Sequence, residues 1–246
     1  WQCLWAQAGG SLANLITPDD RLVRAVVSPE SDLVFTMSPV AFSTWNSAAN
    51  HDNFQPDPMV RLSTPNQDPE AVLFSPDGKT ALLGDPAGER PLVDTRQARV
   101  ITTLPIVPSG SPEWVFSGDG RRLAYGIPDS RLRIIDSSTA RTIADVELPD
   151  GTNKTTLDMT GLRLAAIDRE QVHLLNVDGS KSQIEPLNHP LAVTAAEFDS
   201  SGIRLATATI GGDVYIWDLL TGRQIQKIRS GVNAIHSMTF SPDGNA

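Results

Sequence analysis

The sequence predicts an all-β fold built from one unit that is repeated along the chain. Residues 191–228 show the unit most clearly: three short runs with alternating apolar residues lie between Gly-rich turns, and a fourth, weaker run follows. Alternation at every second position is typical of β-strands with one buried face. Four such runs predict a four-stranded antiparallel sheet, and a series of these sheets predicts a β-propeller in which each sheet is one blade.

A turn of nearly constant composition marks the repeats, and its spacing is regular. Each copy ends in glycine, and successive glycines are 41 or 42 residues apart. Proline presets φ at the second turn position, aspartate bonds to the turn backbone, and glycine takes the position with positive φ. The copies are Phe74-Ser75-Pro76-Asp77-Gly78, Phe116-Ser117-Gly118-Asp119-Gly120, Leu157-Asp158-Met159-Thr160-Gly161, Phe198-Asp199-Ser200-Ser201-Gly202 and Phe240-Ser241-Pro242-Asp243-Gly244.

A second landmark keeps the same phase. An apolar residue followed by Asp or Asn ends the third run of each unit, 15 or 16 residues after the last residue of the turn; for the first pair this turn is a degenerate earlier copy, Val27-Ser28-Pro29-Glu30-Ser31. Two landmarks that stay in phase favour a true structural repeat over chance similarity. The pairs are Trp45-Asn46, Val93-Asp94, Ile135-Asp136, Leu175-Asn176 and Trp217-Asp218.

The two ends of the chain align with parts of a unit. Residues 1–16 match the second half of a unit, and residues 232–246 match the first half. We therefore expect one propeller domain over residues 1–246, truncated within a blade at both ends, with about six blades represented. A parent protein with seven or eight blades is the alternative.

Composition argues against several classes of partner. The formal net charge is −9 and no Lys/Arg cluster is present, so we expect neither nucleic acid nor an anionic membrane as the partner. No apolar run approaches the roughly 20 residues of a membrane span. The single cysteine, Cys3, cannot form an intrachain disulfide or a Cys-based zinc site. We expect a cytoplasmic protein, with a periplasmic or secreted one as the alternative; scarce lysine beside common arginine suggests a bacterial source.

Residues that could carry catalysis are scattered. The four histidines lack metal-ligand spacing, and neither a Gly-x-Ser-x-Gly elbow nor a phosphate loop is present. We therefore expect no metal, no cofactor and no enzyme activity in this chain, although a parent protein could carry a catalytic domain elsewhere.

The turns and the Trp217-Asp218 pair resemble those of WD-repeat β-propellers, and the resemblance spans nearly the whole chain. In that family a His, a Ser or Thr, an Asp and a Trp form a hydrogen-bonded set that stiffens each blade. The resemblance assigns these structural roles to His189, Thr207 and Trp217, with Trp217 packed between neighbouring blades. Gly211 stands where the family has its Asp, so the set is incomplete here.

The resemblance implies that turns between second and third strands, together with the connections between blades, form one face. Arginine is enriched at interface hot spots, so Arg90, Arg131 and Arg169 are candidate anchors, although ordinary solvated charge explains them too. We predict a non-catalytic scaffold or sensor that binds a protein or peptide through this face. The alternative is a propeller enzyme or small-molecule-binding protein with its site at the central channel. The acidic candidates on the predicted face are Asp85, Glu89, Asp129, Glu170 and Asp213.

Overall fold

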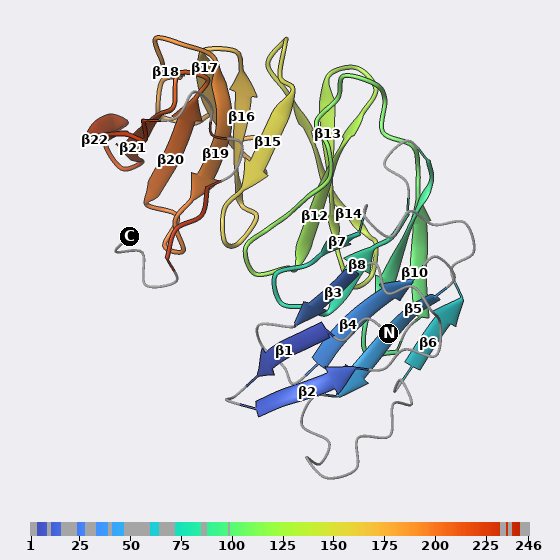
Figure 1. The fold of residues 1–246 in the computed structure, drawn as a ribbon. Coiled ribbons are helices and arrows are strands. Elements are labelled where there is room, and N and C mark those ends of the chain that lie inside the picture. The colour runs from blue at the N-terminus through green and yellow to red at the C-terminus, as the bar shows by residue number, and fades with distance from the viewer. Residues whose placement is uncertain are drawn as a thin grey trace. The chain divides into compact units, whose positions relative to one another are not determined.

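The computed structural model is all-β, and no helix occurs among the residues it describes (Figure 1). These residues are 4–8, 11–15, 24–27, 33–38, 41–46, 60–63, 72–84, 88–97, 99–231, 235 and 238–241. They form five four-stranded antiparallel sheets and one two-stranded sheet. Within each four-stranded sheet the strands follow one another in chain order, as in a propeller blade. The predicted fold class is confirmed.

The chain divides into two compact units: Trp1–Ile106 with Ser138–Ala140, and Val107–Ser137 with Arg141–Ala246. The first unit contains three of the sheets. Their strands are β1 (Leu4–Ala8) and β2 (Ser11–Leu15); β3 (Arg24–Val27), β4 (Leu33–Ser38), β5 (Ala41–Asn46) and β6 (Val60–Ser63); and β7 (Leu73–Phe74), β8 (Thr80–Leu82), β9 (Arg90–Asp94) and β10 (Arg99–Leu104).

The second unit contains the other three sheets, and β11 contacts β15 as β15 contacts β19. Its inner strands are therefore neighbours in chain order. The strands are β11 (Val115–Phe116), β12 (Arg122–Ile127), β13 (Arg131–Asp136) and β14 (Thr142–Glu147); β15 (Lys154–Leu157), β16 (Arg163–Asp168), β17 (Gln171–Asn176) and β18 (Leu187–Asn188); and β19 (Val193–Phe198), β20 (Arg204–Thr209), β21 (Asp213–Asp218) and β22 (Arg223–Arg229).

The hydrophobic cores of the second unit lie between sheets, because the middle strands are buried on both faces. In β16, Leu164 and Ala166 belong to the core shared with the β11–β14 sheet. The intervening Ala165 and Ile167 belong to the core shared with the β19–β22 sheet. Successive side chains of a strand point to opposite faces, so one strand supplies both cores. The β15–β18 sheet is thus held by its neighbours on each side.

The repeated turns have a common backbone geometry. In each described copy the glycine N–H donates to the carbonyl oxygen three residues earlier, at 2.8 to 3.1 Å. The glycine φ angles are 66°, 73°, 67° and 67° at Gly78, Gly120, Gly161 and Gly202. This left-handed conformation is the one that glycine adopts without steric cost. The predicted positive φ of the turn glycine is confirmed at these four sites.

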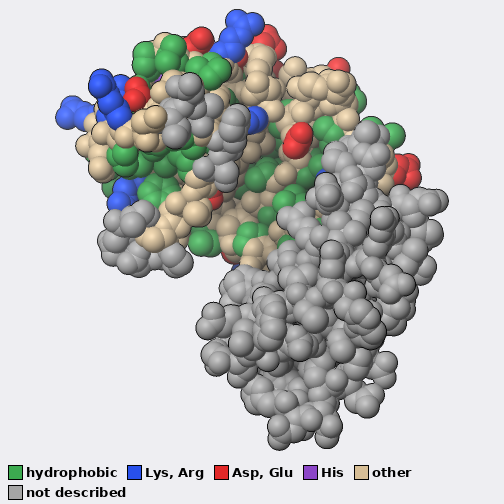
Figure 2. Space-filling model, in the orientation of Figure 1, with side chains coloured by type: hydrophobic (Ala, Val, Ile, Leu, Met, Phe, Trp, Pro, Cys, Tyr) green, Lys and Arg blue, Asp and Glu red, His purple; other side chains and the backbone are tan. Residues whose placement is uncertain are grey.

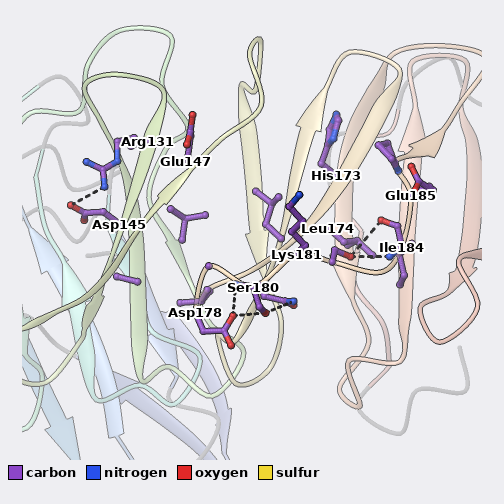
Figure 3. A pocket seen from close by; sticks show the side chains of 18 of the residues that line it. Arg131, Asp145, Glu147, His173, Leu174, Asp178, Ser180, Lys181, Ile184 and Glu185 are labelled. Atoms are coloured by element: carbon purple, nitrogen blue, oxygen red, sulfur yellow. Dashed lines mark hydrogen bonds and ion pairs between the residues drawn. The ribbon is translucent and has the colours of Figure 1, made fainter.

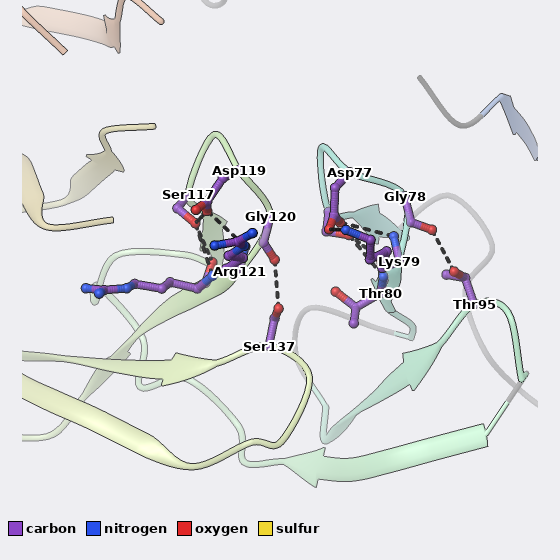
Figure 4. Close-up of polar contacts among 12 residues, drawn as sticks. Asp77, Gly78, Lys79, Thr80, Thr95, Ser117, Asp119, Gly120, Arg121 and Ser137 are labelled. Atoms are coloured by element: carbon purple, nitrogen blue, oxygen red, sulfur yellow. Dashed lines mark hydrogen bonds and ion pairs between the residues drawn. The ribbon is translucent and has the colours of Figure 1, made fainter. Parts of the chain in front are cut away.

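Side chains close these turns in two ways. In the first two copies a serine hydroxyl donates to the aspartate two residues later, Ser75 to Asp77 and Ser117 to Asp119, both at 2.7 Å (Figure 4). In the next two copies the order is reversed, because the carboxylate comes first. The Ser201 hydroxyl donates to Asp199 at 2.7 Å, and Thr160 donates to Asp158 at 3.3 Å. All four turns therefore contain a hydroxyl–carboxylate hydrogen bond, although the two side chains occur in the opposite order in the last two copies.

The glycine carbonyls of these turns also have partners. Hydroxyls of the same sheet bind the first two: Thr95 donates to Gly78 at 2.6 Å and Ser137 donates to Gly120 at 2.7 Å (Figure 4). Arginines of the preceding sheet bind the next two. Arg122 donates to the Gly161 carbonyl at 2.9 Å, and Arg163 donates to the Gly202 carbonyl. These two arginines link consecutive sheets at the end of the strands where the turns lie.

The structure brings His189, Thr207 and Trp217 together. The Trp217 Nε1–H donates to Thr207 Oγ1 at 2.9 Å, and Thr207 Oγ1 lies 2.7 Å from His189 Nε2. His189 Nδ1 lies 3.2 Å from the Glu170 carbonyl, which can only accept. Nδ1 therefore carries the proton in the neutral ring, and Thr207 donates to Nε2. Burial lowers the pKa of His189, which favours this neutral form.

Trp217 packs between neighbouring sheets. It is 8% exposed and belongs to the core that also contains Ala165, Ile167 and Val172 of the preceding sheet. Asp218 lies at the end of β21, where its carboxylate accepts from the Leu220 and Thr221 N–H groups at 2.8 and 3.0 Å. The indole thus fills a core between sheets while its N–H joins the chain of hydrogen bonds through Thr207.

Gly161→Ala is expected to destabilise the second unit more than Gly179→Ala does. Both glycines have positive φ, 67° and 80°. A Cβ at Gly161 would lie 2.6 Å from Arg122 Cδ, whereas a Cβ at Gly179 would meet nothing within 4 Å. We expect a loss of about 1 kcal/mol for Gly179→Ala from backbone strain, and a further 1–3 kcal/mol for Gly161→Ala from overpacking. Urea unfolding measures both free energies of unfolding. Equal losses would show that the added methyl group at position 161 causes no costly clash with Arg122.

Thr207→Val is expected to reduce the free energy of unfolding by about 2–4 kcal/mol, because it leaves Trp217 Nε1–H and His189 Nε2 buried without their partner. Thr155→Val is the matched control, since the Thr155 hydroxyl is buried and has no hydrogen-bond partner among the described residues. That substitution should be neutral or slightly stabilising. Thermal and urea unfolding of both variants tests the difference, and similar losses would contradict the role of the Thr207 hydroxyl.

Candidate functional site

The second unit has one end at which the turns between second and third strands meet the connections between sheets. The residue that follows each outer strand donates its N–H to a carbonyl in the turn of its own sheet. These bonds fix the connections against the turns, so this end of the unit is rigid; we call it the turn face. The donor and acceptor pairs are Leu148 to Ser130 at 2.8 Å, His189 to Glu170 at 2.9 Å and Ser230 to Gly212 at 3.2 Å.

Each connection also packs on the sheet that follows it. The Gly126 N–H donates to the Pro112 carbonyl at 3.2 Å, and the Asn153 N–H donates to the Ile167 carbonyl at the same distance. A Cβ at Gly151 would lie 2.6 Å from Asp168 Oδ1, so the connection touches the next turn closely. The turn face is therefore continuous from one sheet to the next within the second unit.

A pocket of about 230 Å³ opens on the turn face. Its walls come from the connections at 108–112 and 148–152 and from the turn at 127–131. These are segments that the sequence predicted to share one face, and the structure places them together. Proline, glycine and serine dominate the lining, with Asp129 and Arg131 as the charged groups. The pocket suits a small side chain or a stretch of peptide backbone.

Four of the predicted site residues lie exposed on this face. They are Asp129 in the turn before β13, Arg131 at the start of β13, and Arg169 and Glu170 in the turn before β17. Arg131 Nη2 lies 3.9 Å from Asp145, a distant pair. The side of the second unit that Figure 2 shows carries basic, acidic and apolar side chains that are interspersed. The turn face thus offers charges of both signs on a fixed backbone.

The turn face also has strained backbone at residues other than glycine. The φ angles are 65° at Asp129, 52° at Ser130 and 47° at Arg169. Such conformations are unfavourable for residues with a Cβ and persist where the surrounding structure enforces them. Ile127 pairs with Arg131, so Asp129 and Ser130 are successive residues with positive φ in a three-residue turn that contains no glycine. Strain of this kind gathers at functional sites, which favours the turn face as one.

Arg90 does not lie on an accessible face, so the prediction that it anchors a partner is wrong. Only 4% of the surface of Arg90 is exposed to solvent. Its Nε donates to the Leu83 carbonyl at 3.2 Å and its Nη2 donates to the Leu82 carbonyl at 3.3 Å. The side chain folds back along its own hairpin and satisfies carbonyls there. Glu89 is exposed in the first unit, and Asp85 lies outside the described residues.

Asp213 is half-buried and already paired. Its carboxylate lies 2.7 Å from Lys227 Nζ and 4.0 Å from Arg229 Nε on the adjoining strand. The hydrogen bond from Lys227 lowers the pKa of Asp213. Lys227 also lies 5.0 Å from the centre of the Tyr215 ring. The structure assigns Asp213 to a cross-strand cluster, and it adds less free charge to the turn face than the sequence suggested.

A larger groove, of about 990 Å³, lies beside the β15–β18 sheet (Figure 3). It is lined by β14, by residues 173–176 of β17 and by the segment at 177–186. This groove was not predicted from the sequence. The signal was present, because residues 177–186 lack the alternating pattern that marks the fourth strand in other units.

Near the groove, Arg133 binds Asp145 through two hydrogen bonds of 2.8 and 2.7 Å. This bidentate pair lowers the pKa of Asp145, and the Asp145 carboxylate raises that of Arg133. Burial raises the pKa of Tyr125, which packs 4.5 Å from Trp114 between ring centres. Arg133 and Asp145 neutralise each other, so the other charged side chains of the groove remain to act on a ligand.

Across the described part of the chain, no group of three or more His, Cys, Asp or Glu residues could hold a metal ion. Nor is any helix in that part long and apolar enough to cross a membrane. His173 contributes a buried Nε2 without a hydrogen-bond partner among those residues, whereas His51 and His236 lie outside them.

No protein-family model matches this sequence. Comparison with curated proteins likewise finds no match. The likeness to WD-repeat propellers therefore depends on the turns, on the Trp217-Asp218 pair and on the hydrogen-bonded set around Thr207.

Glu197 in β19 gives a pH-dependent prediction. Burial raises the pKa of Glu197 to about 7, from the usual 4.5. The folded state therefore binds more protons than the unfolded state between pH 4.5 and 7, so the Glu197 contribution to stability falls as pH rises through this window. We expect Glu197→Gln to be more stable than the parent at pH 8, by about 1–3 kcal/mol, and nearly equal to it at pH 4.

Urea unfolding at several pH values measures this difference, with Glu113→Gln as an exposed control whose curve should parallel that of the parent. The lowered pKa of His189 acts in the opposite direction, since its contribution is lost as pH falls below 6.5. That term is common to all three proteins and cancels in the comparison. A Glu197→Gln effect that does not change with pH would contradict the prediction.

Proposed function

We propose that this protein is a non-catalytic interaction platform of the WD-repeat type, which binds another protein or a peptide through the turn face. The observation that carries the proposal is the rigid turn face of the second unit. There, strained turns and exposed charges at Asp129, Arg131, Arg169 and Glu170 surround a pocket of about 230 Å³. Loops held on a rigid scaffold are where binding residues concentrate.

The backbone hydrogen bonds that hold the connections against the turns support a role in binding. A surface that is already ordered loses little conformational entropy when a partner binds, so more of the contact energy appears as affinity. The N–H groups of Leu148, His189 and Ser230 hold the connections in place before any ligand arrives. Mixed charges around a small pocket fit a partner that inserts a side chain and pairs charges at the edge.

The proposal is tested by reversing the two exposed arginines, Arg131→Glu with Arg169→Glu. We expect immobilised protein carrying both changes to capture at least about fivefold less of its partner from a lysate, a difference of roughly 1 kcal/mol. Thermal unfolding should be unchanged, because both side chains are exposed. Quantitative mass spectrometry of the captured proteins provides the measurement.

Arg121→Glu with Arg223→Glu is the matched control. These arginines are also exposed, but they lie at the opposite end of the strands, near the turns at 117–121 and 219–222. The charge change is identical, so loss of capture in the control as well would indicate general electrostatics. Equal capture by the parent and the Arg131/Arg169 variant would exclude the turn face as the binding site.

A further inference from the structure

The outer strand of the β15–β18 sheet is much shorter than those of its neighbours. β18 has two residues, whereas β14 has six and β22 has seven. The chain between β17 and β18 is correspondingly long and carries no strand from 177 to 186. Most of β17 therefore has no outer neighbour within its own sheet.

The backbone groups left without a partner can be identified. The Val177 N–H donates to Leu162, so in this register the odd-numbered residues of β17 bond to β16 and the even-numbered ones face outward. Val172 pairs with Leu187 of β18. The Leu174 N–H and carbonyl and the Asn176 N–H find no backbone partner among the described residues; the Asn176 carbonyl accepts from Gly179.

The neighbouring sheets show what is missing. Leu174 occupies the position of Ile134 in β13 and of Ile216 in β21, counted back from the Asp or Asn that ends each strand. Ile134 pairs with Ala144 of β14, and Ile216 pairs with Gln226 of β22. Buried backbone groups without a partner are rare because each costs free energy comparable to a lost hydrogen bond. The outward N–H and carbonyl of Leu174 have no backbone partner among the described residues, and Leu174 lines a groove.

The groove of about 990 Å³ lies along this edge (Figure 3). Leu174 is part of its lining, with Arg131, Asp145 and Glu147 on one side and His173, Ile184 and Glu185 on the other. Ala144 and Val146 of β14 supply apolar surface. The volume is the space that a full outer strand would fill. Four residues of β17 span about 13 Å, which fits an extended segment of about four to six residues.

The groove is acidic. Its lining includes five carboxylates and two basic side chains, Arg131 and Lys181. Asp145 is neutralised by Arg133. Among the described residues, no ion pair engages the other four carboxylates, which are Asp129, Glu147, Asp178 and Glu185. The excess negative charge favours a basic ligand.

We propose that this groove binds a basic, extended segment of a partner protein, which adds to β17 as the missing outer strand. Main-chain hydrogen bonds to Leu174 and Asn176 would supply affinity, and alternate side chains would face the carboxylates. The segment at 177–186 is held in another conformation. The Gly179 N–H donates to Asn176 at 3.1 Å, and Ser180 donates to Asp178 at 2.7 Å.

The probe is a fluorescein-labelled Lys-Val-Lys-Val-Lys-Val peptide, and a Glu-Val-Glu-Val-Glu-Val peptide is its charge control. Fluorescence anisotropy should show the basic peptide binding with Kd below about 1 mM and the acidic one at least tenfold weaker. Full N-methylation of the basic peptide should abolish binding, whereas methylation of alternate residues leaves one pairing edge and should preserve it. Equal binding of the fully methylated peptide, or no binding of the basic peptide, would overturn the proposal.

Amide hydrogen exchange identifies the pairing site. Saturation with the basic peptide should slow exchange at Leu174 and Asn176 at least tenfold. If these amides are already protected in the free protein, the chain covers its own edge and the proposal fails. If protection depends on protein concentration and sedimentation shows dimers, a second copy is the occupant. The basic strand β22, whose residues are exposed throughout, would be its natural contact, and the partner-segment proposal would again fail.

Glu147→Lys tests the charge argument, with Glu113→Lys as the control. Glu147 lines the groove and Glu113 does not, and both are exposed. We expect at least fivefold weaker binding of the basic peptide for Glu147→Lys and no change for Glu113→Lys. Arg131 lines both the groove and the turn-face pocket, so it is left unchanged here and the two proposals stay separable. Equal affinity of the two variants would contradict the role of the acidic lining.

Discussion

Burial of the middle strands on both faces is the constraint on which the second unit depends. The β15–β18 sheet shares its core residues with both neighbours, because Leu164 and Ala166 complete one core while Ala165 and Ile167 complete another. Hydrophobic stabilisation scales with the apolar area removed from water, so each sheet gains most of it from its neighbours. The arginine bonds to Gly161 and Gly202 add polar links between sheets at one end of the strands. The repeats are therefore cooperative rather than independent.

The opposite end of the strands carries most of the exposed charges, although Leu148 and His189 of its connections are buried. There the connections are fixed by backbone hydrogen bonds, which any sequence without proline at the donor position can make. Side chains in the turns, such as Arg169 and Asp129, carry charge and strain without contributing to the cores. This separation lets one scaffold present a specific binding surface. Arg90 shows the converse, since a charged side chain with carbonyls in reach becomes structural.

The groove beside β17 is present because this repeat lacks most of its fourth strand. The unit keeps its 41-residue period, but residues 177–186 form turns instead of an outer strand. The inner three strands supply most core residues of this sheet and Leu187 of β18 supplies another, so the cores are retained although most of the fourth strand is missing and an edge is uncovered. An exposed strand edge is a site for pairing with another chain, and folded proteins usually cover or charge it. Here the edge lies inside an acidic groove, which restricts what can pair with it.

The sequence alone determined the order of strands and the turns, because these depend on local rules: alternation with period two, proline and glycine in turns, and a repeat length that stays constant. The resemblance to WD-repeat propellers implied that Trp217 packs between sheets and that the connections and turns of one sheet share an end. Only the tertiary structure decided which polar groups meet across sheets. Arg122 binds the Gly161 carbonyl 39 residues away, and Arg90 binds carbonyls of its own hairpin. The edge at Leu174 is unpaired because the segment that follows β17 forms no strand beside it. Alternation predicts which face of a strand is buried but does not identify the residues that pack against it.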